Sequence, residues 1–154
     1  MKADLDDIAG WAGSFLQQLQ PTQRRKLMRA VATELRRRQS KRIAEQRNPD
    51  GSAYEPRKPR LRARAGRVRR QMFGKLQTSK FLKVQAGPDS AVVEFAGGVR
   101  RMAAVHQFGL RDRVNRNGGL EVEYARRELL GFGEGDVGRL ADAVLGLVAA
   151  GEAL

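Results

Sequence analysis

The most chemically distinctive feature of this chain is a run of basic side chains between residues 57 and 70. Eight of these fourteen positions are Lys or Arg, and none is acidic. No small core can bury so much charge of one sign, so these side chains must face water or an anionic partner. The basic side chains are Arg57, Lys58, Arg60, Arg62, Arg64, Arg67, Arg69 and Arg70.

The chemistry open to this run is the recognition of anions. Residues 24–83 carry 21 Lys/Arg against 4 Asp/Glu, and the formal net charge of the whole chain is +13. A solvated surface explains this density poorly, because self-repulsion opposes compaction. Contact with nucleic-acid phosphates fits an Arg-rich arm. A protein partner with an acidic surface fits equally, because the planar guanidinium pairs with carboxylates. Composition alone leaves these last two hypotheses open.

Side chains suited to catalysis are scarce. The chain has one histidine, His106, and no cysteine, whereas nucleophilic catalysis needs a base held against a nucleophile and a third group to orient it. Residues 133–138 match G-x-G-x-x-G, but no buried strand precedes them and no acidic residue follows at the required distance. We therefore expect no enzyme, no catalytic residue, no metal site and no cofactor. His106 is expected to be a structural histidine near a helix end.

The N-terminal part is predicted to be a helical hairpin over residues 1–47. Apolar residues recur at spacings of three and four through residues 4–19, which indicates an amphipathic helix. Pro21 suits the first turn of a second helix, which is expected to continue to about residue 47. Asn48-Pro49-Asp50-Gly51 ends this helix, because a residue before proline avoids helical geometry and Asp-Gly turns easily.

Residues 48–77 are predicted to form a basic arm or linker, and residues 78–154 a small α+β core within one domain overall. Prolines at 49, 56 and 59 punctuate the arm, and residues 67–77 carry a weak helical pattern. In the core, we expect strands near 81–86 and 91–95, a helix over 99–107, a hairpin with its tip at 117–119, and a last helix beginning near Asp136. The expected class is α+β, with the C-terminal helix packed on a small antiparallel sheet.

Composition also indicates the cellular compartment in which we expect the protein. The absence of cysteine excludes disulfides and thiolate metal sites. The first residues are acidic after Lys2 and show no apolar signal core, and no window approaches ~18 uninterrupted apolar residues. We expect a soluble protein made in a cytoplasm and not associated with a membrane.

Three stretches resemble the phage virion morphogenesis family, also called tail completion proteins. They are residues 42–60, 103–110 and 124–132, and they follow one another as in that family over nearly the whole chain. The first joins a helix end to an Asn-Pro-Asp-Gly turn and a Lys-Pro-Arg arm. Two departures are Tyr54, where the family has Trp, and Gly133, where a Ser or Thr helix cap is usual.

The resemblance implies a structural role at the head–tail junction of a tailed phage or prophage-derived particle, located in the virion and assembled in the host cytoplasm. The implied partners are other copies of the chain in a ring of six or twelve, a tail-tube or tail-terminator protein, a head connector or adaptor protein, and packaged DNA in the channel. Tyr54 and the basic residues from Arg57 to Arg70 are then expected to contact a partner or the DNA.

Four residues are candidates for the subunit interface. They are His106, Phe108, Arg126 and Arg127. Leu129 and Leu130 are expected to pack the last helix against the sheet. An alternative from another class is a nucleic-acid-binding protein that uses the Arg-rich arm for non-specific phosphate contacts.

Overall fold

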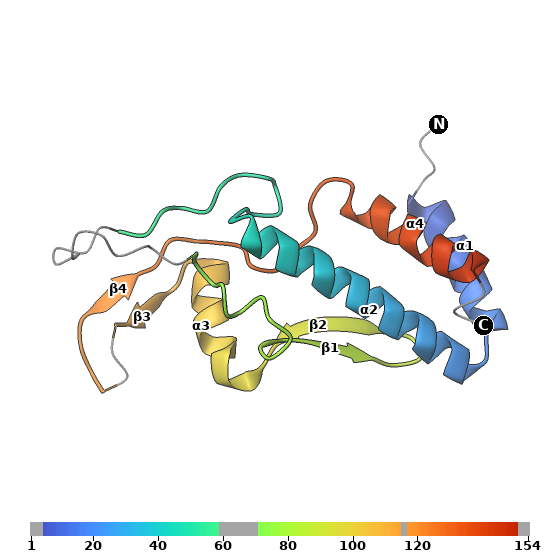
Figure 1. Cartoon of the computed structure of the whole chain (residues 1–154), viewed down its shortest axis with the longest axis horizontal. Helices are drawn as coiled ribbons and strands as arrows, with labels where there is room; N and C mark the ends of the chain where they lie inside the picture. Colours follow the sequence, from blue (N-terminus) through green and yellow to red (C-terminus); the bar gives the residue numbers. More distant parts are fainter. Residues whose placement is uncertain (1–4, 59–70, 115–116, 151–154) are drawn as a thin grey trace.

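The computed structural model describes residues 5–58, 71–114 and 117–150, and it shows the α+β class predicted from the sequence (Figure 1). Its elements follow the expected order of helices, strands, helix, hairpin and helix. The elements are α1 (Leu5–Gln18), α2 (Pro21–Ala44), β1 (Leu82–Ala86), β2 (Ala91–Phe95), α3 (Gly97–Phe108), β3 (Arg111–Arg113), β4 (Glu121–Glu123) and α4 (Asp136–Ala149).

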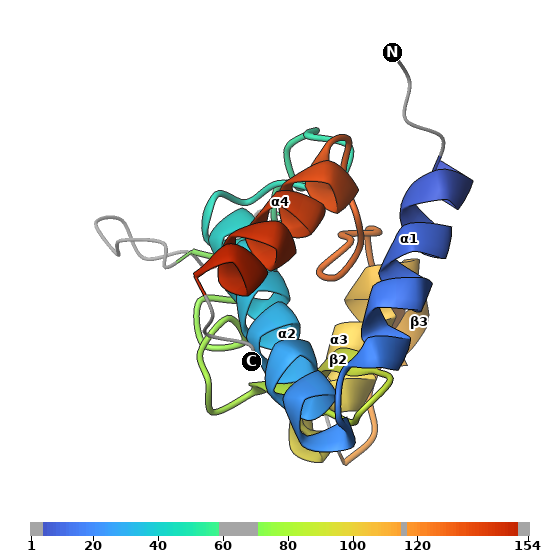
Figure 2. The ribbon, with the colours of Figure 1, turned by 90° about the vertical axis from the view of Figure 1, so that its right-hand side faces the viewer.

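The long helix α2 is the centre of the fold. Pro21 opens it, and the backbone N–H of Gln20 donates to Oε1 of Gln23 (2.8 Å), which satisfies a group at the helix start. One side of α2 covers β1 and β2, and α4 lies along another side (Figures 1 and 2). Two of its side chains, Leu27 and Ile43, are fully buried.

The prediction that the C-terminal helix packs on the sheet is wrong, because α2 occupies that place. α4 packs on α2 instead, and none of its side chains is fully buried. The physical reason is that α2 carries the side chains that the sheet covers, while the apolar side of α4 needs only one neighbouring helix. The first helix, α1, is joined to α2 at Gln20–Pro21, but the two helices diverge (Figure 2).

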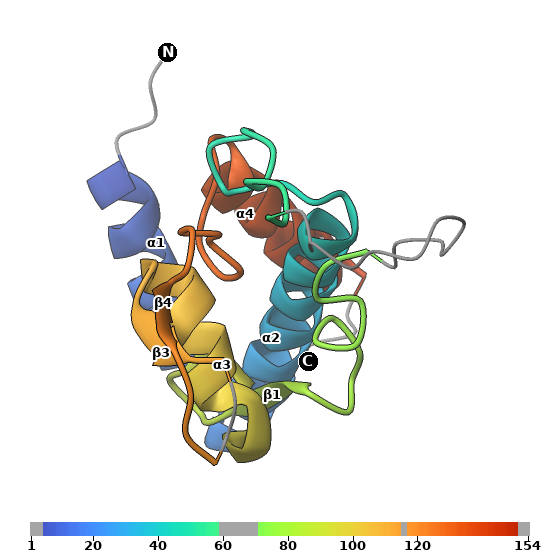
Figure 3. The same ribbon diagram turned by 90° about the vertical axis from the view of Figure 1, so that its left-hand side faces the viewer.

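The strands form two separate antiparallel pairs. In the first, Leu82 pairs with Phe95 and Ala86 with Ala91 across the predicted Gly87–Ser90 turn. In the second, Arg111 pairs with Glu123 in the predicted β3–β4 hairpin. This hairpin and α3 lie at one end of the molecule, and α1 lies at the other end (Figures 1 and 3).

The core joins segments that are far apart in the sequence. Leu129 is fully buried, as expected, and Leu76 is 3% exposed. The described part of the predicted helix over 67–77 is a series of turns, because Phe73 has a left-handed backbone (φ 62°) that interrupts a helix. The buried cluster consists of Ile43, Tyr54, Leu76, Leu82, Phe95, Ala103 and Leu129.

No helix in the described part of the chain combines the length and the apolar character needed to cross a membrane.

Candidate functional site

The beginning of the basic arm, which we call the arm root (residues 48–56), is a folded turn bound to the rest of the chain. The N–H of Asn48 donates to the carbonyl of Ser52 (2.8 Å), and the N–H of Tyr54 donates to the carbonyl of Gln46 (2.7 Å). The Asn48 side chain accepts a hydrogen bond from the N–H of Glu128 (2.9 Å). The start of the predicted arm is therefore fixed within the fold.

Tyr54 anchors the arm root in the core. Its side chain is almost fully buried and meets the ring of Phe73 edge-on, with 5.9 Å between the ring centroids. Its hydroxyl donates to the carbonyl of Glu128 (3.3 Å). Burial raises the pKa of Tyr54 to about 12, although the positive charge of Arg42 opposes this shift. The phenol is thus neutral at physiological pH and stays a hydrogen-bond donor.

Arg127 holds the end of the arm root. Its Nε donates to the carbonyl of Glu55 (2.7 Å), and its Nη2 donates to the carbonyl of Pro56 (3.1 Å). The residue is only 6% exposed, and burial lowers its pKa, with the charge of Arg57 acting in the same direction. We predicted Arg127 as an interface residue, but its guanidinium is used inside its own chain.

A second clamp holds the point at which the chain returns from the arm. Gln46 Nε2 donates to the carbonyl of Met72 (2.9 Å), and Gln46 Oε1 accepts from the N–H of the same residue (3.0 Å). Gln71 Nε2 also donates to the carbonyl of Ala44 (3.1 Å). Both ends of the basic segment 57–70 are therefore bound to the folded core.

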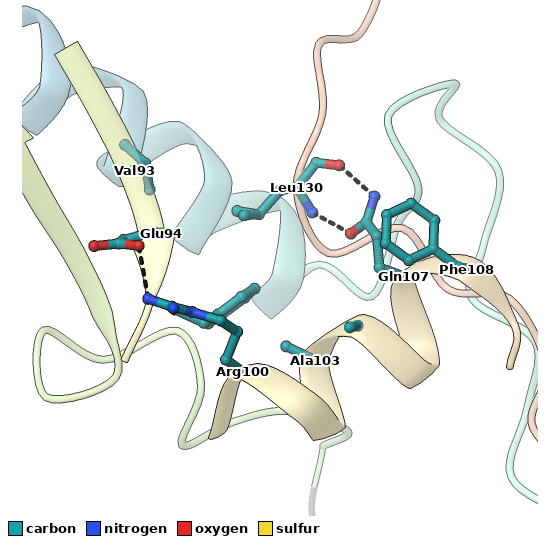
Figure 4. A pocket seen from close by; sticks show the side chains of 9 residues that line it. Val93, Glu94, Arg100, Ala103, Gln107, Phe108 and Leu130 are labelled. Atoms are coloured by element: carbon teal, nitrogen blue, oxygen red, sulfur yellow. Dashed lines mark hydrogen bonds and ion pairs between the residues drawn. The ribbon is translucent and has the colours of Figure 1, made fainter. Parts of the chain in front are cut away.

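Two glutamines hold the segment 129–131, which lies next to the arm root. Gln107 accepts from the N–H groups of Leu129 (2.8 Å) and Leu130 (2.9 Å) and donates to the carbonyl of Leu130 (2.8 Å), as Figure 4 shows in part. Gln39, buried in α2, donates to the carbonyl of Gly131 (3.0 Å) and accepts from its N–H (3.2 Å). Each glutamine thus replaces a strand neighbour for a short extended segment.

Close backbone approach also fixes this region. A Cβ atom at Gly133 would collide with the carbonyl oxygen of Pro49, so a larger residue requires the arm root to move. The N–H of Gly133 donates to Oδ2 of Asp136 (2.7 Å) in the first turn of α4. The arm root, this loop and the start of α4 are consequently one packed unit.

His106, in α3, packs beside Arg127, the residue that holds the arm root. Its ring lies between Phe73 and Tyr124, with centroid distances of 4.8 and 5.1 Å, and its Nδ1 is 3.4 Å from Nη1 of Arg127. Burial lowers the pKa of His106 to about 4, and the charges of Arg127 and Arg57 add to this effect. The imidazole is therefore neutral near pH 7. Among the described residues, no three His, Asp or Glu side chains are grouped to hold a metal ion.

The remaining predicted residues divide into three groups. Arg57 and Lys58 are exposed just beyond the arm root, and Phe108 and Arg126 are exposed on the surface. Arg126 forms an ion pair with Glu128 (3.1 Å) in its own chain. The other basic positions lie outside the described residues; they are Arg60, Arg62, Arg64, Arg67, Arg69 and Arg70.

Sequence reasoning missed the polar side chains that build the site. Gln46, Asn48 and Gln107 lie within the stretches on which the family resemblance was based, which was the available signal. Gln46 has a positive φ (57°), and Gln39 interrupts the apolar stripe of α2, but neither residue type indicates a distant partner.

An apolar groove of about 360 Å³ borders this unit on the side of α3 and β2 (Figure 4). Phe108 and Leu130 lie at one end of it, and the Arg100–Glu94 ion pair (2.9 Å) lies at the other. The groove is lined by Val93, Glu94, Phe95, Arg100, Ala103, Ala104, Gln107, Phe108 and Leu130.

Comparison with known proteins identifies the family of this chain. A profile of the phage virion morphogenesis family matches residues 3–149. The chain is 42% identical over 133 residues to the tail completion protein S of Escherichia phage P2, covering 85% of this chain and 88% of that protein. No solved structure matches.

Proposed function

This chain belongs to the phage virion morphogenesis family, and we propose that it is a structural protein that completes the tail at the head–tail junction of a phage or prophage-derived particle. The observation that carries the proposal is the convergence of the three stretches 42–60, 103–110 and 124–132 on the arm root. Hydrogen bonds from Asn48, Gln107 and Arg127 join them into one unit. The match to the family profile, over residues 3–149, includes all three.

The purpose of this unit, we propose, is to present the basic segment 57–70 to an anionic surface of the assembling particle. Arg127 binds the carbonyl before the segment, and Gln46 binds the backbone after it. Holding both ends reduces the conformational entropy lost when the segment docks. The surface would belong to a neighbouring subunit, a tail-tube, tail-terminator or head-connector protein, or DNA in the channel.

Exposed apolar side chains at one end of the molecule support the same role. Three large apolar side chains, Phe108, Val114 and Leu120, are 64%, 55% and 76% exposed around α3 and the β3–β4 hairpin. Exposed apolar surface that is gathered at one end of a small protein marks an interaction site. We propose that this end contacts another copy in a ring.

Charge reversal of the arm tests the proposal. The variant Arg57→Glu, Arg60→Glu, Arg62→Glu, Arg64→Glu should fold normally but fail to restore infectious particles in cells that lack the native protein. Heads and tails should accumulate unjoined, as counted by negative-stain microscopy. A matched control that reverses exposed Lys75, Lys80, Lys83 and Arg139 changes the net charge equally and should restore particles. A normal yield from the arm variant would contradict the proposal.

The alternative, a free nucleic-acid-binding protein, is favoured only by the charge of the arm. A monomer that binds duplex DNA and is absent from purified particles would support it. A discrete ring in native mass spectrometry, together with its presence in particles, would support the structural role.

A further inference from the structure

The basic side chains of α2 fall into two groups that the structure treats differently. The helix carries nine Lys/Arg and one Glu. The side chains that turn inward have partners: Arg24 pairs with Asp89 (3.4 Å), and Arg38 and Arg42 each approach Asp136 (3.9 Å). The fold thus supplies carboxylates where burial makes an unpaired charge costly.

The outward side chains at the start of α2 have no such partners. Arg25, Lys26 and Arg29 are exposed, and no carboxylate among the described side chains lies within ion-pair distance of them. Farther along, Arg37 shares Glu34 with Arg38, and Lys41 is 3.8 Å from the carboxylate of Glu45. Considering only the side chains that the structure describes, the positive charge at the N-terminal half of this surface is therefore largely uncompensated.

These side chains form a row, which we call the basic ridge: Arg25, Arg29, Thr33, Arg37 and Lys41, with Lys26 beside it. All are exposed and the ridge positions recur every fourth residue. With 1.5 Å of rise and 100° of turn per residue, neighbouring ridge positions are ~6 Å apart along the axis and ~40° apart around it. Arg25, Lys26 and Arg29 therefore share one face of α2, and Lys41 points about 160° away from Arg25. α2 is a single unbroken helix (Figure 1), so this spacing is rigid.

The chemistry of the ridge selects between anionic partners. It contains no aromatic or aliphatic side chain that could fill a pocket, whereas protein interfaces depend on such buried anchors. Lys, Arg and Thr are the usual contacts to the DNA backbone, which carries one charge per ~1.7 Å of duplex axis. We propose that the N-terminal part of the basic ridge, Arg25, Lys26 and Arg29, binds the sugar–phosphate backbone of duplex DNA without reading its sequence. This proposal concerns α2 alone and does not rest on the role of the arm.

The test is the salt dependence of binding by the full-length chain to a fluorescent duplex of mixed sequence. The variant Arg25→Gln, Lys26→Gln, Arg29→Gln should reduce the slope of log K against log salt by about 2 to 3, at ~0.9 per phosphate contact. The control Arg101→Gln, Arg111→Gln, Arg113→Gln changes the net charge equally but removes side chains that pair with Asp112, Glu123 and Glu121. Its slope should change by less than about 1.

The proposal is overturned if the wild-type chain does not bind the duplex at low salt, if the slope of the ridge variant is unchanged, or if the control loses an equal slope. If the wild-type chain binds an acidic polypeptide but not the duplex, the proposal is likewise contradicted. Circular dichroism establishes that each variant is folded. A second variant, Arg25→Lys with Arg29→Lys, keeps the charge and should retain the wild-type slope; a loss of slope there would equally contradict backbone binding.

Discussion

Two adjacent arginines, Arg126 and Arg127, show how neighbouring residues of one type acquire different roles. Arg126 has a side chain that is 64% exposed and pairs with Glu128 at the surface. Arg127 is buried and donates to the backbone carbonyls of Glu55 and Pro56. Exposed ion pairs contribute little to stability, whereas a buried charged donor leaves unsatisfied carbonyls when it is removed.

Replacing Arg127 by Met should lower the free energy of unfolding by about 2 to 4 kcal/mol, because two carbonyls would lose a charged donor. The matched variant Arg126→Met should cost less than about 1 kcal/mol. Urea unfolding of both proteins, followed by circular dichroism, measures the difference. If the two variants were equally stable, Arg127 would not be the residue that fixes the arm root.

At the scale of elements, the loop before α4 connects the last helix to the arm root. Gly133 leaves no room for a side chain against the carbonyl of Pro49, and its N–H is bound by Asp136 at the start of α4. Asp136 also lies 3.9 Å from Arg38 and from Arg42 of α2. A change in this loop is therefore expected to affect both the arm and the helix.

The variant Gly133→Ala should lower the free energy of unfolding by about 1 to 3 kcal/mol, because its Cβ forces the arm root to shift. Gly146, inside α4, is the matched control, since a Cβ there meets no atom within 4 Å. Gly146→Ala should instead stabilise the protein by about 0.5 to 1 kcal/mol, as expected for a helix interior. Chemical denaturation distinguishes the two signs; destabilisation by both, or by neither, would show that the packing at Gly133 is unimportant.

At the scale of the whole molecule, the exposed apolar surface and the first helix lie at opposite ends. α3 and the β3–β4 hairpin form one end, and α1 forms the other (Figure 1). A contact between different surfaces of identical copies is heterologous, and it generates a ring when the rotation closes. This arrangement supports the ring that we propose for the assembled protein.

The variant Phe108→Asp should prevent self-association and leave the fold intact, because this side chain is 64% exposed. Leu145→Asp, on α4, is the control: that residue is 45% exposed but lies away from α3 and the hairpin. Native mass spectrometry should show smaller species for Phe108→Asp only. An unchanged ring would place the subunit interface elsewhere.

The sequence by itself determined the features that depend on neighbouring residues. Periodicity and turn residues predicted α1, α2, both strand pairs, α3 and α4. These signals are local, because capping, turn geometry and amphipathic spacing act within a few residues. The quoted stretches also identified the family, which the comparisons confirmed.

Only the tertiary structure decided which elements meet and which polar side chains become structural. It put α2 rather than α4 on the sheet, turned Arg127 inward, and made Gln39, Gln46 and Gln107 the supports of distant backbone. The reason is that burying a polar group costs free energy unless the group finds a hydrogen-bond partner. That partner here lies tens of residues away along the chain, so no local pattern reveals it.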